Sequence, residues 1–502
     1  MKDTLAARRV PAVFRRAFPE GRLVVVSNRQ PYAHDRDDAG EIAVDRPAGG
    51  LVQALDPVMR ALGGTWVAWG HGAADREVVD EHDRLGVPPE DPAYTLRRLW
   101  LSDEEIENHY FGFSNQGLWP LCHNILEHVR FRDAFRDAYR GVNARFARAA
   151  VEELGETSGL IWFQDYHLAL APAFAREARP DAALAHFWHI PWPAWETFRV
   201  CPWKVELLEG LLANDFLGFH LESFANNFLT ACARELDAFV DPSKQAVVHQ
   251  GRLTHVAGLP ISIDVARFEQ MAASPDTDAR MARIVARYGL EDERVGIGVD
   301  RLDYTKGIVE RLEALRLLFH RYPKLVGHFT FIEIVVPSRS EIPAYQILED
   351  EVDAKIESLN AALGTDAWRP VITIKESLPQ SELVAFYRLA DVAVVSSIQD
   401  GMNLVVKEFV ASQDLDDPGA VCLSEFAGAS DELAHTLPVN PFYTEGFAED
   451  LRHALEMPLE ERRERMEAMK ADLRGNTVYT WMADFLAAAG AARIAAMAGS
   501  MH

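Results

Sequence analysis

Two cations five residues apart are the first residues of this sequence whose types and spacing indicate chemistry. They belong to the segment Arg301-Leu302-Asp303-Tyr304-Thr305-Lys306-Gly307, which follows the apolar run Val295–Val299. Arginine is always charged and binds phosphate oxygens in pairs, whereas lysine supplies a point charge. On a loop after a strand, Arg301 and Lys306 can neutralise a diphosphate leaving group without a metal ion. The alternative is a surface ion pair with Asp303, which would contribute little stability and does not require this location.

A second segment combines a glycine turn with a helix start. After the apolar run Val392–Val395 the chain reads Asp400-Gly401-Met402-Asn403-Leu404-Val405-Val406-Lys407-Glu408. The N–H groups at a helix start favour a diphosphate. Glu408 lies about two helical turns beyond Asp400, so its carboxylate can accept both hydroxyls of a ribose. The alternatives are an N-cap role for Asp400 and a solvated helix face for Glu408.

Glycines and an arginine follow the first apolar run, Leu23–Val26. The run ends in Ser27-Asn28-Arg29, and the loop after it closes on Ala48-Gly49-Gly50 at a helix start. Adjacent glycines let the backbone approach a ligand, although a turn that needs glycine dihedral angles is the simpler explanation of these residues alone. Neither this loop nor Gly296-x-Gly298 has the three glycines of a dinucleotide-binding G-x-G-x-x-G motif.

Other polar groups also follow apolar runs. Gln164-Asp165-Tyr166-His167 and His189-Ile190-Pro191 each come directly after one, and the rigid turn at His189 suits recognition of sugar hydroxyls. Arg339 is a further cation beyond a long apolar run. Tyr110 and Trp119 can form an aromatic wall with polar tips, although a plain core role explains them equally well.

The apolar runs that precede these groups predict the fold. Runs of four to eight apolar residues bounded by turns are typical of strands buried on both faces, and amphipathic helical stretches separate many of them. The alternation predicts parallel sheets in an α/β protein with two doubly wound domains. We place them at 1–258 and 259–475, followed by a helix at 476–502 that packs back on the first domain. Ligands of such sheets bind beyond the carboxyl ends of the strands, so two facing sheets would form one cleft.

Composition excludes several classes of partner. The 502 residues include 51 Lys plus Arg and 76 Asp plus Glu, a net charge of −25, which disfavours nucleic acid and anionic membranes. Four scattered cysteines indicate core thiols, and no apolar stretch is long enough to cross a bilayer. The basic N-terminus lacks serine and contains Asp3 and Glu20, so we interpret it as a leader arm of a cytoplasmic protein.

Together these segments resemble the trehalose-6-phosphate synthases. The resemblance covers residues 22–485 in family order and rests on Ser27-Asn28-Arg29, Ala48-Gly49-Gly50, Leu118-Trp119-Pro120, Asp165-Tyr166-His167, His189-Ile190-Pro191, Arg301–Gly307, Asp400–Leu404 and Glu408. It implies the GT-B fold, with two facing Rossmann-like domains, and transfer of glucose, with retention, from a nucleoside-diphosphate glucose, usually UDP-glucose, to glucose 6-phosphate. The resemblance further implies front-face attack without a protein nucleophile, and no metal or other cofactor is expected.

The resemblance also implies residue roles. Arg301 and Lys306 would hold the donor diphosphate, Glu408 the ribose, and Asp400 and His189 the donor glucose. Residues that would complete the donor site are Gly49, Gly50, Gly401, Met402, Asn403 and Leu404. Asp165 would contact the acceptor sugar, and the acceptor phosphate pocket would consist of Arg29, Tyr110, Trp119 and Arg339. We expect small-molecule substrates only, and a homo-oligomer.

Three departures from the family pattern leave the acceptor open. They are Gln399 before Asp400, His109 before Tyr110, and Gln30-Pro31-Tyr32 after Arg29. The alternatives are therefore a glucosylglycerol-phosphate synthase, which accepts glycerol 3-phosphate, and a sensor that binds sugar phosphate without catalysis. Arg339 favours a sugar phosphate, and the intact donor residues disfavour the sensor. A nicotinamide-dependent oxidoreductase is disfavoured by the missing glycine motif. The donor base stays open among UDP, ADP and GDP.

Overall fold

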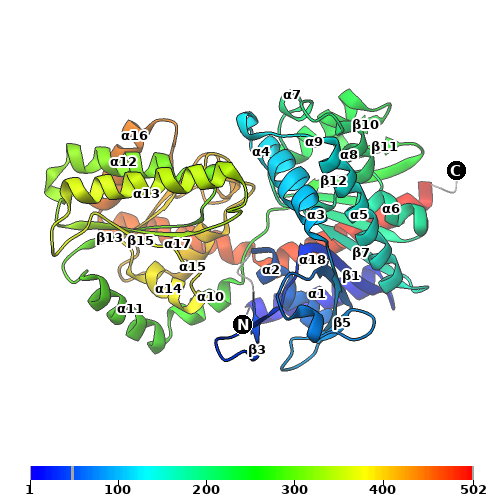
Figure 1. Ribbon diagram of the computed structural model, residues 1–502, viewed down its shortest axis with the longest axis horizontal. Coiled ribbons are helices and arrows are strands. Elements are labelled where there is room, and N and C mark those ends of the chain that lie inside the picture. Colours follow the sequence, from blue (N-terminus) through cyan, green and yellow to red (C-terminus); the bar gives the residue numbers. More distant parts are fainter. Residues whose placement is uncertain (1, 47–49, 500–502) are drawn as a thin grey trace. The chain divides into compact units, whose positions relative to one another are not determined.

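The computed structural model describes residues 2–46 and 50–499, which form two compact units (Figure 1). Unit 1 consists of Met1–Ile261 and Val478–His502, and unit 2 consists of Ser262–Thr477. The contacts therefore divide the chain after residues 261 and 477, where the sequence-based boundaries stand after 258 and 475.

Unit 2 is built on a six-stranded parallel sheet. Its strands are β13 (Arg294–Arg301), β14 (Phe329–Val336), β15 (Val371–Ile374), β16 (Val392–Val395), β17 (Ala420–Ser424) and β18 (Leu437–Val439). They are arranged in the order β15-β14-β13-β16-β17-β18, and every pair is parallel. The first strand thus lies inside the sheet, and the direction of winding reverses between β13 and β16. This reversal is the topological switch point at which doubly wound sheets bind ligands.

Helices cover both faces of this sheet: α12, α13 and α16 on one face, and α10, α11 and α14 on the other (Figure 1). The helices of unit 2 are α10 (Val265–Ala272), α11 (Pro275–Tyr288), η6 (Tyr304–Lys306), α12 (Ile308–Arg321), η7 (Pro323–Leu325), α13 (Pro343–Leu363), α14 (Gln380–Leu389), α15 (Leu404–Ser412), η8 (Gly428–Asp431), α16 (Thr444–Glu456) and α17 (Leu459–Gly475). A core that includes Leu315, Phe331 and Leu451 joins α12 and α16 to the sheet. Burial on both faces explains why most residues of these strands are apolar.

Unit 1 contains a ten-stranded sheet with a parallel centre. Its order is β10-β11-β12-β9-β8-β7-β1-β4-β6-β5, and only the pairs β10–β11, β11–β12 and β5–β6 are antiparallel. The strands are β1 (Arg22–Arg29), β4 (Thr65–Trp69), β5 (Arg84–Val87), β6 (Tyr94–Leu99), β7 (Gly159–Gln164), β8 (Ala183–Trp188), β9 (Phe216–Phe219), β10 (Phe239–Asp241), β11 (Ala246–His249) and β12 (Arg252–Gly258), with β2 (Ala33–Arg36) and β3 (Ile42–Asp45) in a separate hairpin. The winding of this sheet reverses between β1 and β7, so unit 1 has a switch point of its own.

The helices of unit 1 include one long π-helical segment. They are α1 (Lys2–Ala17), α2 (Gly50–Leu62), α3 (Asp103–Glu105), the π-helix η2 (Ile106–Leu118), α4 (Trp119–Cys122), α5 (Asp133–Leu154), α6 (Ala171–Ala178), α7 (Trp195–Phe198), α8 (Lys204–Leu211), α9 (Glu222–Glu235) and α18 (Val478–Gly499), with short 3₁₀ turns at η1 (Asp75–Glu77), η3 (Leu126–His128), η4 (Tyr166–Leu168) and η5 (Pro242–Lys244). Each of the nine clearest apolar runs in the sequence forms a strand, which confirms the α/β class; these runs are 23–26, 160–163, 184–188, 216–219, 295–299, 329–336, 371–374, 392–395 and 420–423. The strands that the runs do not indicate are short, contain polar residues or lie near sheet edges, as in the alternating β6.

The leader-arm prediction for the N-terminus is wrong. Residues 2–17 form α1, which packs against α18, and the side chains of Val10 and Phe14 are buried. The two helices approach so closely that a Cβ on Gly490 would lie 2.5 Å from the Cβ of Ala17. Arg15 and Arg16 are in the last turn of the same helix whose apolar side chains Val10 and Phe14 are buried in unit 1. The local positive charge therefore does not mark a detached arm.

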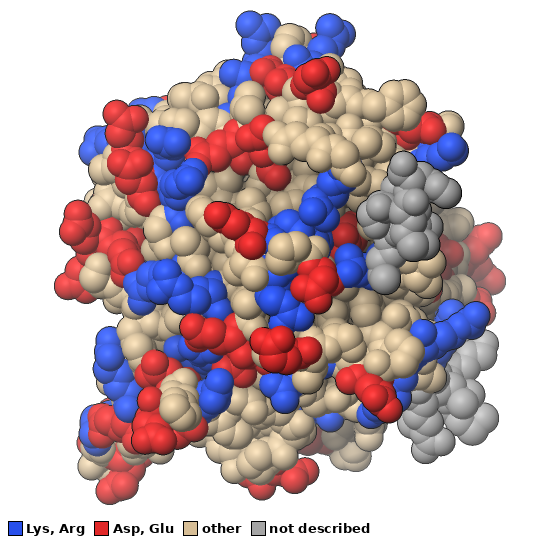
Figure 2. All heavy atoms as spheres, turned by 90° about the vertical axis from the view of Figure 1, so that its right-hand side faces the viewer, with Lys and Arg blue, Asp and Glu red and all other residues tan. Residues whose placement is uncertain are grey.

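Charges of both signs lie on the face of the molecule that Figure 2 draws. Figure 2 shows Lys and Arg side chains interspersed with Asp and Glu over the face that it draws, rather than a field of one sign. The four cysteines are all buried, as expected for core thiols. Among residues 2–46 and 50–499, we find no helix with the length and hydropathy needed to cross a membrane.

Gly307, between η6 and α12, provides a test of the fold next to the unit 2 switch point. Its φ is +61°, and a Cβ there would lie 2.0 Å from the carbonyl oxygen of Ser396. Gly289 has a similar φ of +70° with nothing within 4 Å of its Cβ position, so Gly289→Ala is a matched control. We expect Gly289→Ala to cost about 1–2 kcal/mol from the left-handed backbone alone. Gly307→Ala should cost about 2–5 kcal/mol because a backbone clash is added. Equal unfolding midpoints for the two variants in thermal denaturation would contradict this packing.

Candidate active site

The switch point of unit 2 brings together two of the predicted segments. The loop that contains Lys306 follows β13, and the loop that contains Asp400 follows β16, the strand beside it. A backbone hydrogen bond of 2.8 Å from the N–H of Ile398 to the carbonyl of Thr305 joins the two loops. Residues that are 94 positions apart in sequence therefore form one edge of the sheet.

Asp303 shapes the first loop. Its side chain is fully buried and accepts hydrogen bonds from the backbone N–H and the hydroxyl of Thr305, at 3.0 and 2.9 Å. Its other oxygen lies 3.2 Å from Nη1 of Arg339 and accepts a hydrogen bond from the hydroxyl of Tyr345. Burial would raise the pKa of Asp303, but Arg339, Arg301 and Lys306 outweigh it and hold the pKa below its usual value. The alternative of a surface ion pair is therefore wrong, because Asp303 is an interior anchor.

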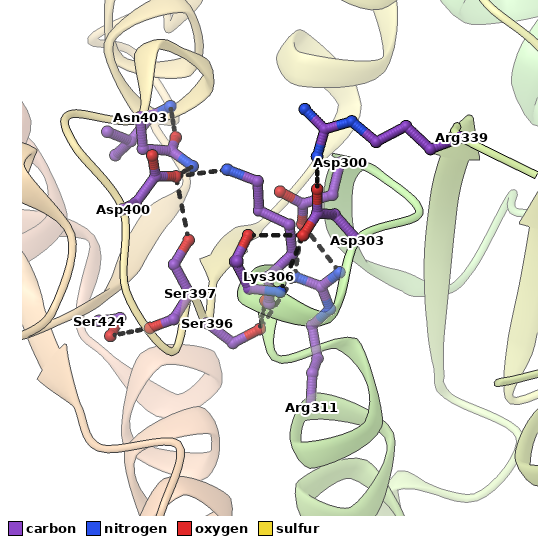
Figure 3. Close-up of polar contacts among 12 residues, drawn as sticks. Asp300, Asp303, Lys306, Arg311, Arg339, Ser396, Ser397, Asp400, Asn403 and Ser424 are labelled. Carbon is purple, nitrogen blue, oxygen red and sulfur yellow. Dashed lines mark hydrogen bonds and ion pairs between the residues drawn. The ribbon is translucent and has the colours of Figure 1, made fainter. Parts of the chain in front are cut away.

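Lys306 reaches across to the second loop. Its Nζ lies 2.6 Å from Oδ2 of Asp400, and the same oxygen lies 3.3 Å from the Oγ of Ser397 and the Nδ2 of Asn403 (Figure 3). Lys306 and Asp400 keep 12% and 14% of their side-chain surface exposed, so the pair is not completely buried. The edge thus combines a cation that can meet a phosphate with a carboxylate that can accept from hydroxyls.

The N-cap of α15 is Asn403 and not Asp400. Asn403 accepts a hydrogen bond from the N–H of Val406 and has a φ of +77°, in the left-handed region that asparagine tolerates better than most residues. Asp400 is thereby left to bind Lys306. The glycine turn beneath is tightly packed, since a Cβ on Gly428 would lie 2.2 Å from the carbonyl oxygen of Gly401. Gly401, Met402 and Asn403 are buried, and Leu404 begins the helix half-buried.

Glu408 is not on a solvated helix face. Only 8% of the residue is exposed, and its carboxylate accepts a hydrogen bond of 3.1 Å from the hydroxyl of Tyr387 on α14. Burial raises the pKa of Glu408 to about 7, because few groups compensate the charge. A carboxyl group that is held apart from bulk water and titrates near neutrality is typical of a functional site.

In unit 1, Arg29 stands at the switch point, at the end of β1. The Oγ of Ser27 donates to the carbonyl of Arg29 at 2.6 Å and accepts from the indole of Trp66, which anchors the strand end. The side chain of Arg29 is half-buried. Gly50 begins α2 and is also half-buried, whereas Gly49 lies outside the described residues.

Asp165 follows β7 on the other side of that switch point. Its φ of +67° is unusual for aspartate, and its Oδ1 accepts from the backbone N–H groups of Tyr166 and His189. His189 follows the neighbouring strand β8, and its Nε2 lies 2.9 Å from Oε1 of Gln164. Burial, with His220 and His186 nearby, lowers the pKa of His189 well below its ordinary value. The imidazole is therefore neutral and can exchange hydrogen bonds with hydroxyl groups.

Tyr110 and Trp119 come from the π-helix η2 and from α4 directly after it. Tyr110 is half-buried, and its ring is stacked on that of His167, with the ring centroids 5.9 Å apart and an angle of 11° between the ring planes. Trp119 is 6% exposed and lies against His123. The wider π-helical turn is stabilised by Asn115, whose Nδ2 donates to the carbonyl of Tyr110 five residues earlier. Such turns are rare and are often found at functional sites.

The structure thus divides the predicted site residues between the two units. Unit 2 places Arg301, Lys306, Asp400 and residues 401–404 at the switch-point loops, Arg339 after the adjacent strand β14, and Glu408 farther along α15. Unit 1 places Arg29, Asp165 and His189 at neighbouring strand ends. Sequence reasoning missed Tyr387 and Ser397 as partners of site residues. Ser397 follows a strand and was open to the same argument, but nothing in the sequence marks Tyr387.

Comparison with known proteins agrees with this arrangement. The family model described as glycosyltransferase family 20 matches residues 21–490. A trehalose-6-phosphate synthase of Mycobacterium avium is 37% identical over 477 residues, which are 94% of this chain and 95% of that protein. A bifunctional trehalose-6-phosphate synthase/phosphatase of Thermoproteus tenax is 38% identical over 93% of this chain, which spans only 63% of that longer protein.

Solved structures show the same fold at similar identity. An α,α-trehalose-phosphate synthase (UDP-forming) from Burkholderia xenovorans, in complex with glucose-6-phosphate, aligns with a TM-score of 0.83 and 32% identity over 93% of this chain and 99% of that one. A structure from E. coli bound with UDP-2-fluoro glucose gives a TM-score of 0.83 and 31% identity over 94% and 99% of the two chains. The GT-B fold class and the resemblance inferred from the motifs are confirmed. Because the matched region includes the switch-point loops of both units, this chain belongs to glycosyltransferase family 20.

Proposed function

We propose that this protein is an α,α-trehalose-phosphate synthase. It transfers glucose from UDP-glucose to glucose 6-phosphate with retention of configuration, and it releases trehalose 6-phosphate and UDP. The observation that carries this proposal is the Lys306–Asp400 pair at the unit 2 switch point, 2.6 Å apart and not completely buried. Solved relatives that share the fold bind glucose 6-phosphate and a UDP-glucose analogue, which supports both substrates.

In the proposed donor site, cations take the diphosphate and carboxylates take the hydroxyls. Arg301 and Lys306 would bind the diphosphate, helped by the backbone around residues 401–404 and by Gly49 and Gly50. Glu408 would accept from the ribose hydroxyls. Asp400 and the neutral imidazole of His189 would hold the hydroxyls of the donor glucose.

The proposed acceptor site uses the other cations. Arg29 and Arg339 would bind the phosphate of glucose 6-phosphate, with Tyr110 and Trp119 as an aromatic wall. Asp165 would orient the acceptor sugar. Its carboxylate is held by two backbone N–H groups, and such preorganisation lowers the cost of ordering a substrate.

The charges suggest how the bond is exchanged. In a front-face reaction the acceptor hydroxyl forms the new glycosidic bond on the face from which UDP leaves, and the departing phosphate oxygen takes its proton. The negative charge that develops on UDP would be stabilised by Arg301 and Lys306, so neither a metal ion nor a protein nucleophile is part of the proposal. A homo-oligomeric state and a cytoplasmic location stay predictions.

Product analysis tests the proposal directly. With UDP-glucose and glucose 6-phosphate the protein should form trehalose 6-phosphate, detected by mass spectrometry, at a rate that a chelator does not change. Glycerol 3-phosphate should react far more slowly, and ADP- and GDP-glucose should be poorer donors. Turnover with glycerol 3-phosphate alone would establish the glucosylglycerol-phosphate synthase instead, and binding of glucose 6-phosphate without donor consumption would establish the sensor. A metal requirement that survives chelation controls would contradict the proposed leaving-group chemistry.

Replacing Arg301 tests the leaving-group role. Arg301→Ala should lower kcat/KM for UDP-glucose by about 10²-fold or more, the scale of one lost electrostatic partner in a transition state. Arg294→Ala is the matched control, because Arg294 stands exposed at the opposite end of the same strand. Steady-state kinetics of the two variants decide the matter: a loss of less than about threefold for Arg301→Ala would overturn the assignment.

The raised pKa of Glu408 predicts a pH dependence of donor binding. Ribose hydroxyls donate to the ionised carboxylate, and an acid with a pKa of about 7 becomes ionised as the pH rises through that value. The affinity for UDP-glucose should therefore increase by up to about tenfold between about pH 6 and about pH 8, as the ionised fraction rises from about 9% to about 91%. UDP-glucose is the proper ligand because its esterified diphosphate does not titrate in this range. In calorimetry, Glu408→Gln should bind more weakly and lose this pH slope; a slope equal to that of the wild type would contradict the assignment.

A further inference from the structure

A completely buried arginine lies beneath the switch point of unit 2. Arg311 is in the first turn of α12 and has no exposed surface. Its guanidinium lies 3.0 Å from the carboxylate of Asp300 and 2.7 Å from that of Glu333. It also donates to the carbonyl of Val394 and to the Oγ of Ser396, at 3.2 and 3.1 Å. One side chain thereby joins the strands β13, β14 and β16.

Gly298, in β13, makes room for this side chain. A Cβ at this position would lie 2.9 Å from Cζ of Arg311. The pair Gly296-x-Gly298 is therefore explained by packing, with no role in binding a dinucleotide. Gly296 similarly faces aromatic rings, and a Cβ there would lie 2.6 Å from the ring of Phe331.

Stability alone is a weak explanation for the ion cluster. One cation and two carboxylates are taken out of water, and their mutual attraction often does no more than offset the cost of desolvation. Apolar residues of similar volume frequently stabilise such a site equally well. A cluster of this kind does, however, impose one geometry on the segments that it joins, because each donor of a guanidinium has a defined direction.

Ser396 transmits that geometry to the diphosphate-binding loop. Its Oγ accepts from Arg311 and is directed at the carbonyls of Lys306 and Gly307, at 3.0 and 2.9 Å (Figure 3). Since the guanidinium only donates, the hydroxyl proton must point toward the two carbonyls. The backbone at Lys306 is consequently held by a chain of hydrogen bonds that begins at Arg311.

The same chain reaches the partner of Lys306. Ser396 and Ser397 are consecutive, and the Oγ of Ser397 lies 3.3 Å from Oδ2 of Asp400, the oxygen that contacts Lys306. Arg311 and the two serines thus connect to both residues of the Lys306–Asp400 pair: Ser396 to the backbone of Lys306, and Ser397 to the carboxylate of Asp400. A shift of about 1 Å in a binding group is enough to lose much of its effect on a reaction.

We propose that Arg311, acting through the hydroxyl of Ser396, is a positioning residue that sets Lys306 for the donor diphosphate. The proposal rests on the function proposed above, in which Lys306 binds UDP-glucose. Arg311 itself is buried and touches no substrate. Its effect reaches the ligand through the Ser396 hydroxyl and the backbone of Lys306, with Asp300 and Glu333 holding the guanidinium in place.

A double-mutant cycle on UDP affinity, measured by calorimetry, tests this proposal. Ser396→Ala removes only the connecting hydroxyl and should weaken UDP binding about fivefold, the worth of about one hydrogen bond. In the Lys306→Ala background the same change should weaken binding less than about twofold, because the group that it positions is gone. The KM for glucose 6-phosphate should stay within about twofold of the wild type. A purely structural role would give equal losses in both backgrounds.

Thr254→Val is the matched control in unit 1. Thr254 is equally buried, and its hydroxyl also donates to two carbonyls, those of Leu212 and Asn214, each at 2.9 Å. This control should lower the thermal midpoint about as much as Ser396→Ala does and leave UDP affinity unchanged. Equal UDP affinities of Ser396→Ala and the control, or a loss that persists without Lys306, would overturn the inference. Failure of the wild type to bind UDP or to turn over would instead overturn the proposed function.

Discussion

The parallel pairing of β13 with β16 is the constraint on which the rest of unit 2 depends. Only the register of Gly296 with Val392 and of Ile297 with Ala393 joins these strands, yet it brings two distant segments to one sheet edge. The Lys306–Asp400 pair exists because both loops leave the sheet there. In unit 1, the corresponding parallel pairing of β1 with β7 has the same consequence for Arg29 and Asp165. In both units the chemistry is located by the order of the strands more than by any local motif.

The sequence was sufficient for those features that local pattern determines. Buried parallel strands are nearly continuous apolar runs, and polar residues after them lie at a known edge, so Lys306 and Asp400 could be predicted. Features that depend on distant neighbours could not be. The carboxylate of Glu408 accepts a hydrogen bond from Tyr387 on another helix, and the partner of Asp400 is Lys306, 94 residues away in the sequence. The π-helix that presents Tyr110 likewise has no signature in hydrophobic periodicity.

The net charge of −25 does not contradict the proposal of two anionic substrates. The cations of the unit 2 site are arranged around carboxylates that the interior holds in place: Asp303 beside Arg339, and Asp400 beside Lys306. These ion pairs at the strand ends are distinct from the exterior face in Figure 2, where acidic and basic side chains are interspersed. Small phosphorylated molecules would meet the charges at the strand ends, whereas a long polyanion would meet the charges of the exterior.

The packing of α18 on unit 1 has a consequence for how the protein is made. Trp481 and Phe485 of α18 lie against Trp162 of β7, and the rings of Phe485 and Trp162 are stacked with their centroids 4.2 Å apart. Helix α18 also contacts α1. The whole of unit 2 precedes α18 in the chain. During synthesis, the face of the unit 1 sheet that contains Trp162 therefore stays without α18 until more than two hundred residues of unit 2 have been made. Folding of the first unit is completed last, and the exposed face is where a chaperone would be needed most.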